Sequence, residues 1–484
     1  MSAFRISAVS AAALTVLIAG CTVGPNYKKP TAPAPPAFKE TAPPPSIPNG
    51  SWKQAQPSDQ VLRGKWWEIY NDPQLNALED KVAISNQTLK AATEQYFSAR
   101  AAVRAARAAY YPTLSAGPSI SRQHLSQNRP TAVPGAIEQY GDFSLAGEAS
   151  WEPDLWGQVR RTVEASRANA QASAADLANV ELSIRSELAQ DYFELRGLDL
   201  QKQLLDNTVI SYSDYLDLTR TRFKGGVATD SDVALAETQL KSTQAQAIDV
   251  GVARAQFEHA IATLTGEPAS TFSLAQAPLS LPLPQVPTGL PSELLERRPD
   301  IAGMERRADA ANAQIGIAIA AYYPNITLTG TGGFESKSAG TWIQGPSALW
   351  SLGASASELL FDAGRRHAVT EEARDNYEAT VANYRQSVLS AFQEVEDNLA
   401  ALRILDQESA TQAEAVAAAQ RSLQISTNRY KQGLDNYLVV LTAQTTLLTN
   451  QRTQADITTR QFAANVLLIK ALGGGWDTTQ LPKL

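Results

Sequence analysis

The residues able to carry out covalent or metal chemistry are few and widely spaced. The three histidines, His124, His259 and His367, lie far apart, and the sequence has no HExxH pair or second ligand cluster. The run 330–333 (GTGG) has the composition of a nucleotide-binding loop, but it lies within an alternating strand pattern, where glycine makes room for a lumen or a neighbour. We therefore predict that the protein is not an enzyme and needs no metal or cofactor.

The chemistry that the sequence does indicate is acylation of Cys21, the only cysteine in the 484 residues. It follows Arg5, an apolar run over 11–19 and a final Ile-Ala-Gly, which together are typical of a secretory signal ending in a lipobox. Residues 1–20 are thus predicted to be a lipoprotein signal peptide, and the thiol to accept a diacylglycerol. An ordinary export signal with a chance cysteine is the alternative. Thr22 follows the cysteine, and the absence of aspartate there favours the outer membrane.

Charge and proline content describe the start of the mature chain. Loss of residues 1–20 removes one base and no acid, leaving 42 − 1 = 41 Lys and Arg against 49 Asp and Glu, a net charge of −8. This excess argues against nucleic acid as a partner. Residues 23–60 are rich in proline, which predicts an extended tether with little packing of its own. Ordered structure is expected to begin near Trp66.

The sequence repeats itself over more than two hundred residues. Residues 109–115 (AYYPTLS) recur as 321–327 (AYYPNIT), an offset of 321 − 109 = 212. Further along the offset becomes 207, where Arg222 corresponds to Arg429 and Gly266 to Gly473. An internal duplication is predicted, at a period far too long for a solenoid.

Each half is predicted to hold long helices in antiparallel pairs. An apolar stripe with an average spacing of 18/5 = 3.6 residues predicts a helix from about 157 to 201; its members are Leu177, Val180, Ile184, Leu188, Tyr192 and Leu195. Breaks are expected at 224–226 and 431–433, with Asp230 and Asn436 as caps just beyond them.

Between the helices, period-two alternation predicts a β-hairpin in each half, near 111–152 and 323–360. The strands are expected near 111–122, 140–152, 323–335 and 347–360, long enough to cross a bilayer when tilted. A soluble hairpin packed on a helix is the alternative.

Insertion of these strands into a membrane requires several copies of the chain. The unpaired edge of an open sheet is too costly in lipid, and four strands are too few to close a barrel. Two copies would supply eight strands and three would supply twelve. The small, hydroxyl-rich face, which includes Thr327, Thr329 and Ser355, suits a watery lumen and favours three.

Several motifs together resemble the outer membrane factors of tripartite efflux pumps, the OprM/TolC-like, NodT-type efflux lipoproteins. They are the lipobox cysteine, the proline-rich tether, and the segments 72–75 (DPQL), 289–301 (GLPSELLERRPDI), 429–437 (RYKQGLDNY) and 471–476 (ALGGGW). The resemblance covers essentially the whole mature chain, and the RRPDI stretch is its most specific part.

The resemblance implies an α+β membrane protein: a homotrimer with a twelve-stranded transmembrane β-barrel, four strands per chain, continued by a long α-helical barrel. It also implies an outer membrane channel anchored by lipid, and partners in a periplasmic adaptor protein and an inner-membrane transporter of the RND type. The same fold also serves type I protein secretion. A lipid-anchored coiled-coil scaffold in the periplasm would share the helices but needs no lipid-facing strands.

In this family the periplasmic end is closed by helix tips, which correspond to 222–232 and 429–445. The resemblance implies constriction at Leu438 and ties between helices at Tyr430 and Lys431. Carboxylates near the mouth come from Asp230, Asp232 and Asp435; helix capping is the alternative for Asp230, and ordinary packing for Leu438.

Two features of this chain depart from the family pattern. Lys431 stands where close relatives commonly carry arginine, and lysine lacks the planar fork for a bidentate contact. Thr442 and Thr445 stand where they commonly carry aspartate and arginine. The departures put ionic gate contacts at these positions in doubt.

We divide the chain accordingly, into 1–20 signal peptide, 21–65 lipid-anchored tether, 66–266 first repeat, 267–296 inter-repeat equatorial segment, 297–475 second repeat and 476–484 C-terminal tail. The cargo and the identity of the partners are not encoded in any of these motifs.

Overall fold

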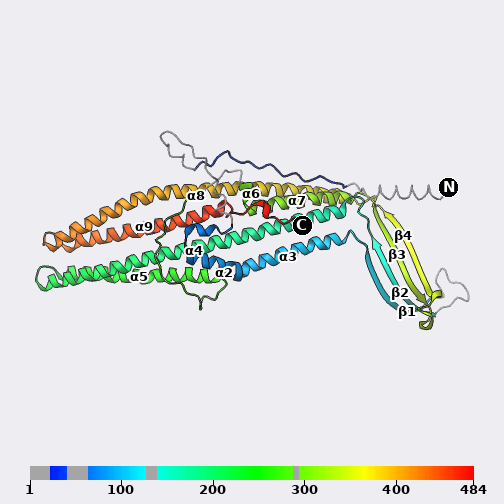
Figure 1. Cartoon of the computed structure of the whole chain (residues 1–484), viewed down its shortest axis with the longest axis horizontal. Coiled ribbons are helices and arrows are strands. Elements are labelled where there is room, and N and C mark those ends of the chain that lie inside the picture. Colours follow the sequence, from blue (N-terminus) through cyan, green and yellow to red (C-terminus); the bar gives the residue numbers. More distant parts are fainter. Residues whose placement is uncertain (1–21, 41–63, 127–138, 287–293) are drawn as a thin grey trace.

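The computed structural model describes residues 22–40, 64–126, 139–286 and 294–484. The predicted signal peptide and Cys21 lie outside these residues. Figure 1 shows an elongated molecule in which long helices run side by side and a four-stranded sheet continues from one end.

The elements follow one another in two similar series. The first contains η2 (Trp66–Tyr70), α2 (Pro73–Ser85), α3 (Gln87–Ala108), β1 (Thr113–His124), β2 (Gln139–Trp151), α4 (Gln158–Lys224) and α5 (Asp230–Leu264). The second contains α6 (Leu294–Arg297), α7 (Pro299–Ala320), β3 (Asn325–Ser336), η4 (Ala339–Thr341), η5 (Gly345–Ser347), β4 (Ala348–Ser357), α8 (Arg365–Lys431), α9 (Tyr437–Ala471) and η6 (Thr478–Gln480).

Corresponding helices have the same lengths in the two series. Helices α3 and α7 each have 22 residues, α4 and α8 each 67, and α5 and α9 each 35. Corresponding contacts recur as well. Asn86 donates to the Leu264 carbonyl (2.8 Å), and Arg298 donates to the Ala471 carbonyl (3.0 Å), pairs related by 86 + 212 = 298 and 264 + 207 = 471. This recurrence is what an internal duplication predicts.

The predicted helix stripe and turns agree with the structure. Ile184, Leu188, Tyr192 and Leu195 are buried in a core that also contains Trp66, and α4 and α8 end at Lys224 and Lys431. The helix expected over 157–201 continues to Lys224, because the sequence holds no break before Gly225. At its 67 residues, α4 is about 100 Å long.

One predicted cap is wrong and the other is confirmed. Asp230 is the first residue of α5 and not its cap. Thr229 caps the helix instead, accepting from the Asp232 amide (3.2 Å) while the Asp232 carboxylate accepts from the Thr229 amide (2.9 Å). This reciprocal capping box satisfies two otherwise unpaired N–H groups, which Asp230 alone would not do. Asn436 caps α9 as predicted.

The expectation that the proline-rich tether packs little is wrong for its described part. Residues 22–40, here called the N-terminal strap, lie along α7 and α8 (dark blue in Figure 1). Phe38 is buried in a hydrophobic cluster with Tyr384 and Val388 of α8. Proline removes N–H donors but leaves carbonyls and neighbouring side chains free to make such contacts.

The strands form one antiparallel sheet in the order β1-β2-β3-β4, with β1 and β4 at its edges. The register gathers apolar residues on one face: Leu114, Ala116, Pro118, Ile120, Phe143, Leu145, Ala149, Trp151, Ile326, Leu328, Phe334, Trp350, Leu352 and Ala354. The opposite face carries Ser115, Ser119, Ser144, Ser150, Thr327, Thr329, Thr331, Ser351 and Ser355. The predicted alternation is therefore confirmed.

The helices form two tiers, and the helices are ordered across each tier as the strands are ordered across the sheet, from the first series to the second. Contacts between elements give the order α3, α4, α7, α8 next to the sheet and α5, α4, α9, α8 further away. In each tier and in the sheet, one edge belongs to the first series and the other to the second. Among the described residues, no helix combines the length and apolar composition needed to span a membrane.

Gly266→Ala should lower stability substantially. Gly266 has a φ of +73°, and a Cβ there would lie 2.3 Å from the Ser85 carbonyl oxygen. Gly226→Ala is the matched control, because Gly226 has a φ of +74° but no atom within 4 Å of a Cβ. The control should cost about 1–2 kcal/mol and Gly266→Ala roughly 2–4 kcal/mol in unfolding free energy. Equal losses in denaturant titrations would show that the contact with Ser85 imposes no constraint.

Candidate functional site

The turns between paired helices lie together at the end of the molecule far from the sheet (Figure 1). Gly226 and Gly433, at φ +74° and +77°, close the α4–α5 and α8–α9 turns. The structure thus brings the two predicted tip segments, 222–232 and 429–445, to one place.

Arg222 and Tyr430 join these two tips. The Arg222 guanidinium carbon lies 4.6 Å from the Tyr430 ring centroid, and its Nη1 donates to the Lys431 carbonyl (3.2 Å). Tyr430 is only 3% exposed, and its hydroxyl donates to Thr219 Oγ1 (3.4 Å). The tie therefore combines a cation–π contact with a charge-assisted hydrogen bond between α4 and the end of α8.

The charged residues predicted near the mouth have mostly local partners. Asp435 accepts from Arg429 Nε (2.7 Å), and this hydrogen bond holds the pKa of the Asp435 carboxyl below its usual range. Asp232 belongs to the capping box, and Asp230 is exposed. The side chain of Lys431 is also exposed, so within one chain this residue contributes its carbonyl to the tie.

Leu438 and the two threonines lie along α9 just beyond the turn. Leu438 is 54% exposed in the single chain. Thr442 donates to the Leu438 carbonyl (2.9 Å), and Thr445 donates to the carbonyls of Leu441 and Thr442. Both hydroxyls therefore bond to α9 itself and not to another helix.

Arg222 lies in the predicted tip segment, but no local pattern in the sequence indicates its role. The available signal was its recurrence as Arg429 at the 207-residue offset. The recurrence could not show that the two arginines have different partners, Tyr430 for Arg222 and Asp435 for Arg429.

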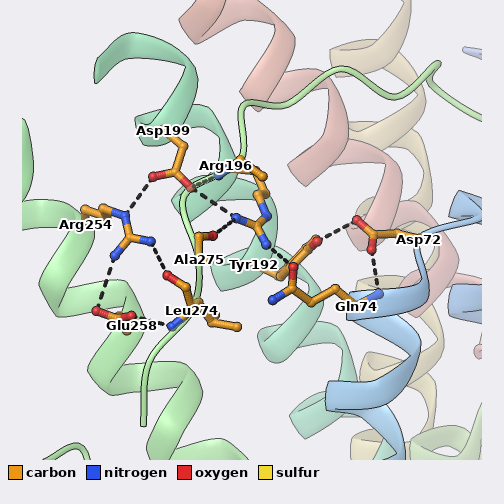
Figure 2. Close-up of polar contacts among 10 residues, drawn as sticks. Asp72, Gln74, Tyr192, Arg196, Asp199, Arg254, Glu258, Leu274 and Ala275 are labelled. Atoms are coloured by element: carbon orange, nitrogen blue, oxygen red, sulfur yellow. Dashed lines mark hydrogen bonds and ion pairs between the residues drawn. The ribbon is translucent and has the colours of Figure 1, made fainter. Parts of the chain in front are cut away.

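A second polar cluster, the equatorial clamp, joins α4, α5 and the inter-repeat segment at mid-length (Figure 2). The Asp199 carboxylate, 1% exposed, accepts from Arg196 (3.1 Å) and Arg254 (2.7 Å). The same arginines donate to the carbonyls of Ala275 (2.8 Å) and Leu274 (2.7 Å). The paired charges offset the cost of burial and fix the segment against both helices.

The clamp extends to α2 through Tyr192. Its hydroxyl donates to Asp72 Oδ2 (2.5 Å), while Asp72 Oδ1 accepts from the Gln74 amide (2.8 Å) and caps α2 (Figure 2). The Arg196 guanidinium carbon lies 4.8 Å from the Tyr192 ring. The clamp thus joins side chains of α2, α4 and α5 to carbonyls of the inter-repeat segment. At the tips, the Arg222 tie lies beside a buried hydrophobic cluster that includes Tyr212, Leu216 and Tyr437.

Asp191→Asn should flatten the pH dependence of stability. Burial, then Glu187 and Glu194 on the same helix, raise the pKa of Asp191 to about 7. A carboxyl whose pKa is higher in the folded state binds its proton more tightly there, so stability falls as pH rises from about 4 to 7. The variant should lose less thermal stability than the wild type between about pH 5 and pH 8. The exposed Asp214→Asn on α4 is the control, and identical pH profiles for all three proteins would refute the assignment.

An elongated helical body with a two-faced sheet at one end is the fold of outer membrane channels such as OprN, and the chain belongs to the outer membrane efflux protein family. The model for "Outer membrane efflux protein" matches residues 78–267 and 290–474. It is thus an efflux protein of the outer membrane, as the sequence predicted.

Individual relatives match almost end to end. The toluene efflux pump outer membrane protein TtgF of Pseudomonas putida is 31% identical over 466 residues, 96% of each chain. The pyoverdine export outer membrane protein OpmQ of Pseudomonas aeruginosa is 31% identical, over 86% of this chain and 88% of its own length. Among solved structures, the outer-membrane channel OprN is 29% identical with a TM-score of 0.85, and the match covers 94% of this chain and all (100%) of that one.

Proposed function

We propose that the chain is the passive outer membrane duct of a tripartite efflux pump and exports small molecules. An inner-membrane transporter of the RND type would supply the cargo through a periplasmic adaptor. The four-stranded sheet carries the proposal, because one face is apolar and the other is rich in hydroxyls. That pattern suits lipid on one side and water on the other. The names of TtgF and OpmQ, which refer to toluene and pyoverdine, support a small-molecule cargo.

The sheet and the helices support closure of three copies into a ring. Strands β1 and β4 are the edges of the sheet among the described residues, and in lipid these edges would have to pair with another copy. Three copies give twelve strands and a lumen wide enough for solutes, whereas eight strands would be filled by side chains.

Both edges of the helical tier far from the sheet carry exposed apolar side chains. Helices α5 and α8 lie at opposite edges of this tier. Ile248 and Val252 are exposed on α5, and Ile404 and Ile425 are exposed on α8. A contact between unlike edges is heterologous and closes into a ring when the rotation allows it. The lipid-facing strands favour this duct over a periplasmic coiled-coil scaffold.

The proposed division of the chain follows the internal duplication. Residues 66–266 and 297–475 would be the two repeats, joined by the equatorial segment 267–296, with 476–484 as a tail. The equal helix lengths and the recurring Asn86 and Arg298 contacts support it. Residues 21–65 would carry the lipid anchor, although 22–40 are packed and not loose.

The tips would form the periplasmic gate. In a ring, three copies of Leu438 would surround one axis, where leucines close a narrow passage by dewetting. Tyr430 and Lys431 would help to hold the closed state, with Arg222 as an additional residue. Asp230, Asp232 and Asp435 would place carboxylates near the mouth, beside their local roles.

Cys21→Ser should abolish lipidation and leave trimers able to form, because a barrel holds the protein in the membrane without the acyl chains. Intact-mass measurement of the mature N-terminus should show a diacylglyceryl adduct on the wild type and none on the variant. An unmodified wild-type N-terminus would refute the lipoprotein assignment.

Planar-bilayer recording tests the duct, combined with deletion of the gene in its host. The purified protein should form conducting pores, and the deletion strain should become more sensitive to drugs or solvents. A protein that forms no pores would fit the scaffold. Unchanged sensitivity together with loss of a secreted protein would instead favour a type I secretion conduit.

A further inference from the structure

The N-terminal strap contacts α7 and then α8 in an order that follows its own sequence. On α7, moving away from the sheet, Asn312 donates to the Pro25 carbonyl (3.0 Å), and the Tyr27 hydroxyl donates to Glu305 Oε1 (2.8 Å). Further away, on α8, Arg385 donates to the Thr31 carbonyl (3.2 Å), and the Lys39 amide donates to Glu396 Oε1 (2.7 Å). Each later residue of the strap contacts a helix position further from the sheet, so the strap is an extended chain that does not loop back.

Both ends of the strap are held in defined sites. At the sheet end, the Val23 amide donates to the Trp156 carbonyl (3.1 Å), next to the start of α4. Arg161, buried in α4, donates to the carbonyls of Val23 and Gly24 (both 3.2 Å). A Cβ on Gly24 would lie only 2.4 Å from Gly316 Cα, so the strap approaches α7 closely at this point.

At the other end, Glu396 and Arg403 of α8 form a clasp. The Glu396 carboxylate accepts from the amides of Lys39 (2.7 Å) and Glu40 (2.9 Å), and Arg403 donates to Glu40 Oε2 (2.6 Å). The hydrogen bond from Arg403 holds the pKa of Glu40 below its usual range. Beside the clasp, Phe38 is 5% exposed.

The clasp occupies the place in the second half that the equatorial clamp occupies in the first. Arg403 corresponds to Arg196 by 196 + 207 = 403, and each arginine binds an extended segment outside the helices. The hydrophobic clusters correspond in the same way, since Leu188 packs with Leu274 in one and Val395 with Phe38 in the other. The equivalent positions on α4 and α8 are therefore each covered by an extended segment, the inter-repeat segment on α4 and the N-terminal strap on α8.

The length of the strap matches the distance between its two sites with little slack. From Val23 to Glu40 there are 40 − 23 = 17 residue steps, about 53 Å in a polyproline conformation. Along α8, Arg365 to Glu396 covers 396 − 365 = 31 residues, about 47 Å of helix. The starts of α4 and α8 lie at a similar level, because Trp156 stacks on Tyr323 and Arg366 lies over Tyr322.

We propose that the strap is a taut spacer that fixes the start of the mature chain at the junction of strands and helices. The clasp on α8 holds residues 39–40 in place, and a second site beside Trp156 and Arg161, here called the seat, holds residues 22–24. Thr22, the peptide neighbour of Cys21, packs against Gly157 in that seat. The spacer's role in placing a lipid rests on the proposed acylation of Cys21, whereas the docking of residues 22–40 does not.

Shortening the strap tests the spacer. Deletion of residues 32–37 leaves 17 − 6 = 11 steps, at most about 40 Å even when the chain is fully extended, which is too short to reach both sites. The Val23, Lys39 and Glu40 amides should be protected from hydrogen exchange in the intact protein. In the deletion, exchange should accelerate at least about ten-fold at one end. Alanine at positions 33, 35 and 36 keeps the length and should keep both ends protected.

A clasp variant provides the second arm. Glu396→Ala with Arg403→Ala removes every acceptor and donor of the clasp, so it should release Lys39 and Glu40 while Val23 stays protected. Protection of both ends in the deletion, or fast exchange of all three amides in the unaltered protein, would overturn the proposal. The readout requires neither transport nor acylation, so failure of the spacer is distinguishable from failure of the duct or of the lipid assignment.

Discussion

Replacing Leu438 with serine is expected to raise single-channel conductance and sensitivity to vancomycin, a solute too large for general porins. Serine removes the apolar contact that three copies would make around the axis. That loss is on the order of 1–2 kcal/mol per copy, enough to raise the open probability roughly ten-fold or more. Thr442 and Thr445 donate to carbonyls of α9 itself and therefore do not tie α9 to another helix. More of the closed state's stability would then depend on Leu438, so the effect should be large.

Leu434→Ser is the matched control for this experiment. Leu434 is about as exposed as Leu438, at 62%, but it lies in the turn that precedes α9 and not at the predicted constriction, so its loss should leave conductance unchanged. Thr442→Asp adds the carboxylate missing from this chain and should shift the pore toward cation selectivity. Unchanged conductance in Leu438→Ser, with folding and assembly intact, would place the constriction elsewhere and leave Leu438 as a packing residue.

Arg222→Ala is expected to open the pore by releasing the tie between the tips. The variant loses the cation–π contact with Tyr430 and the hydrogen bond to the Lys431 carbonyl. Together these are worth about 2 kcal/mol in each copy. Arg222→Lys keeps the charge but not the planar stacking, so its conductance should be intermediate.

Arg429→Ala controls for the loss of a positive charge at the same tip. Arg429 pairs with Asp435 at a more exposed position, and solvent screening weakens such a pair. Its removal should change conductance less than Arg222→Ala does. If the two alanine variants conduct equally, net charge and not the Tyr430 tie controls the tips.

The hairpins and long helices could be predicted from sequence because their signals are local. Alternation over 142–151 and 325–334 reports which side chains share a face, and the α4 stripe reports a buried face, whatever the rest of the chain does. Turns were equally readable, since glycine at positions 226 and 433 supplies the positive φ that each turn needs.

The sequence-based predictions fail where partners are distant in sequence or where composition does not determine packing. Arg222 and Tyr430 are 430 − 222 = 208 residues apart, and no local pattern connects them. Proline content predicted a loose tether, but the docking of Phe38 depends on a pocket formed by α8. Thr229 and Asp230 both suit a cap by residue type, and only the position of Asp232, three residues after Thr229, identifies Thr229 as the cap.

Native mass spectrometry of the intact protein in detergent tests the central claim most directly. In the proposed barrel, the two edge strands of each sheet would pair with other copies, and the hydroxyl-rich face would line the lumen. The predicted result is a single species of three copies that persists after the acyl chains are removed by Cys21→Ser. A stable monomer, or a dimer with eight strands, would contradict the duct.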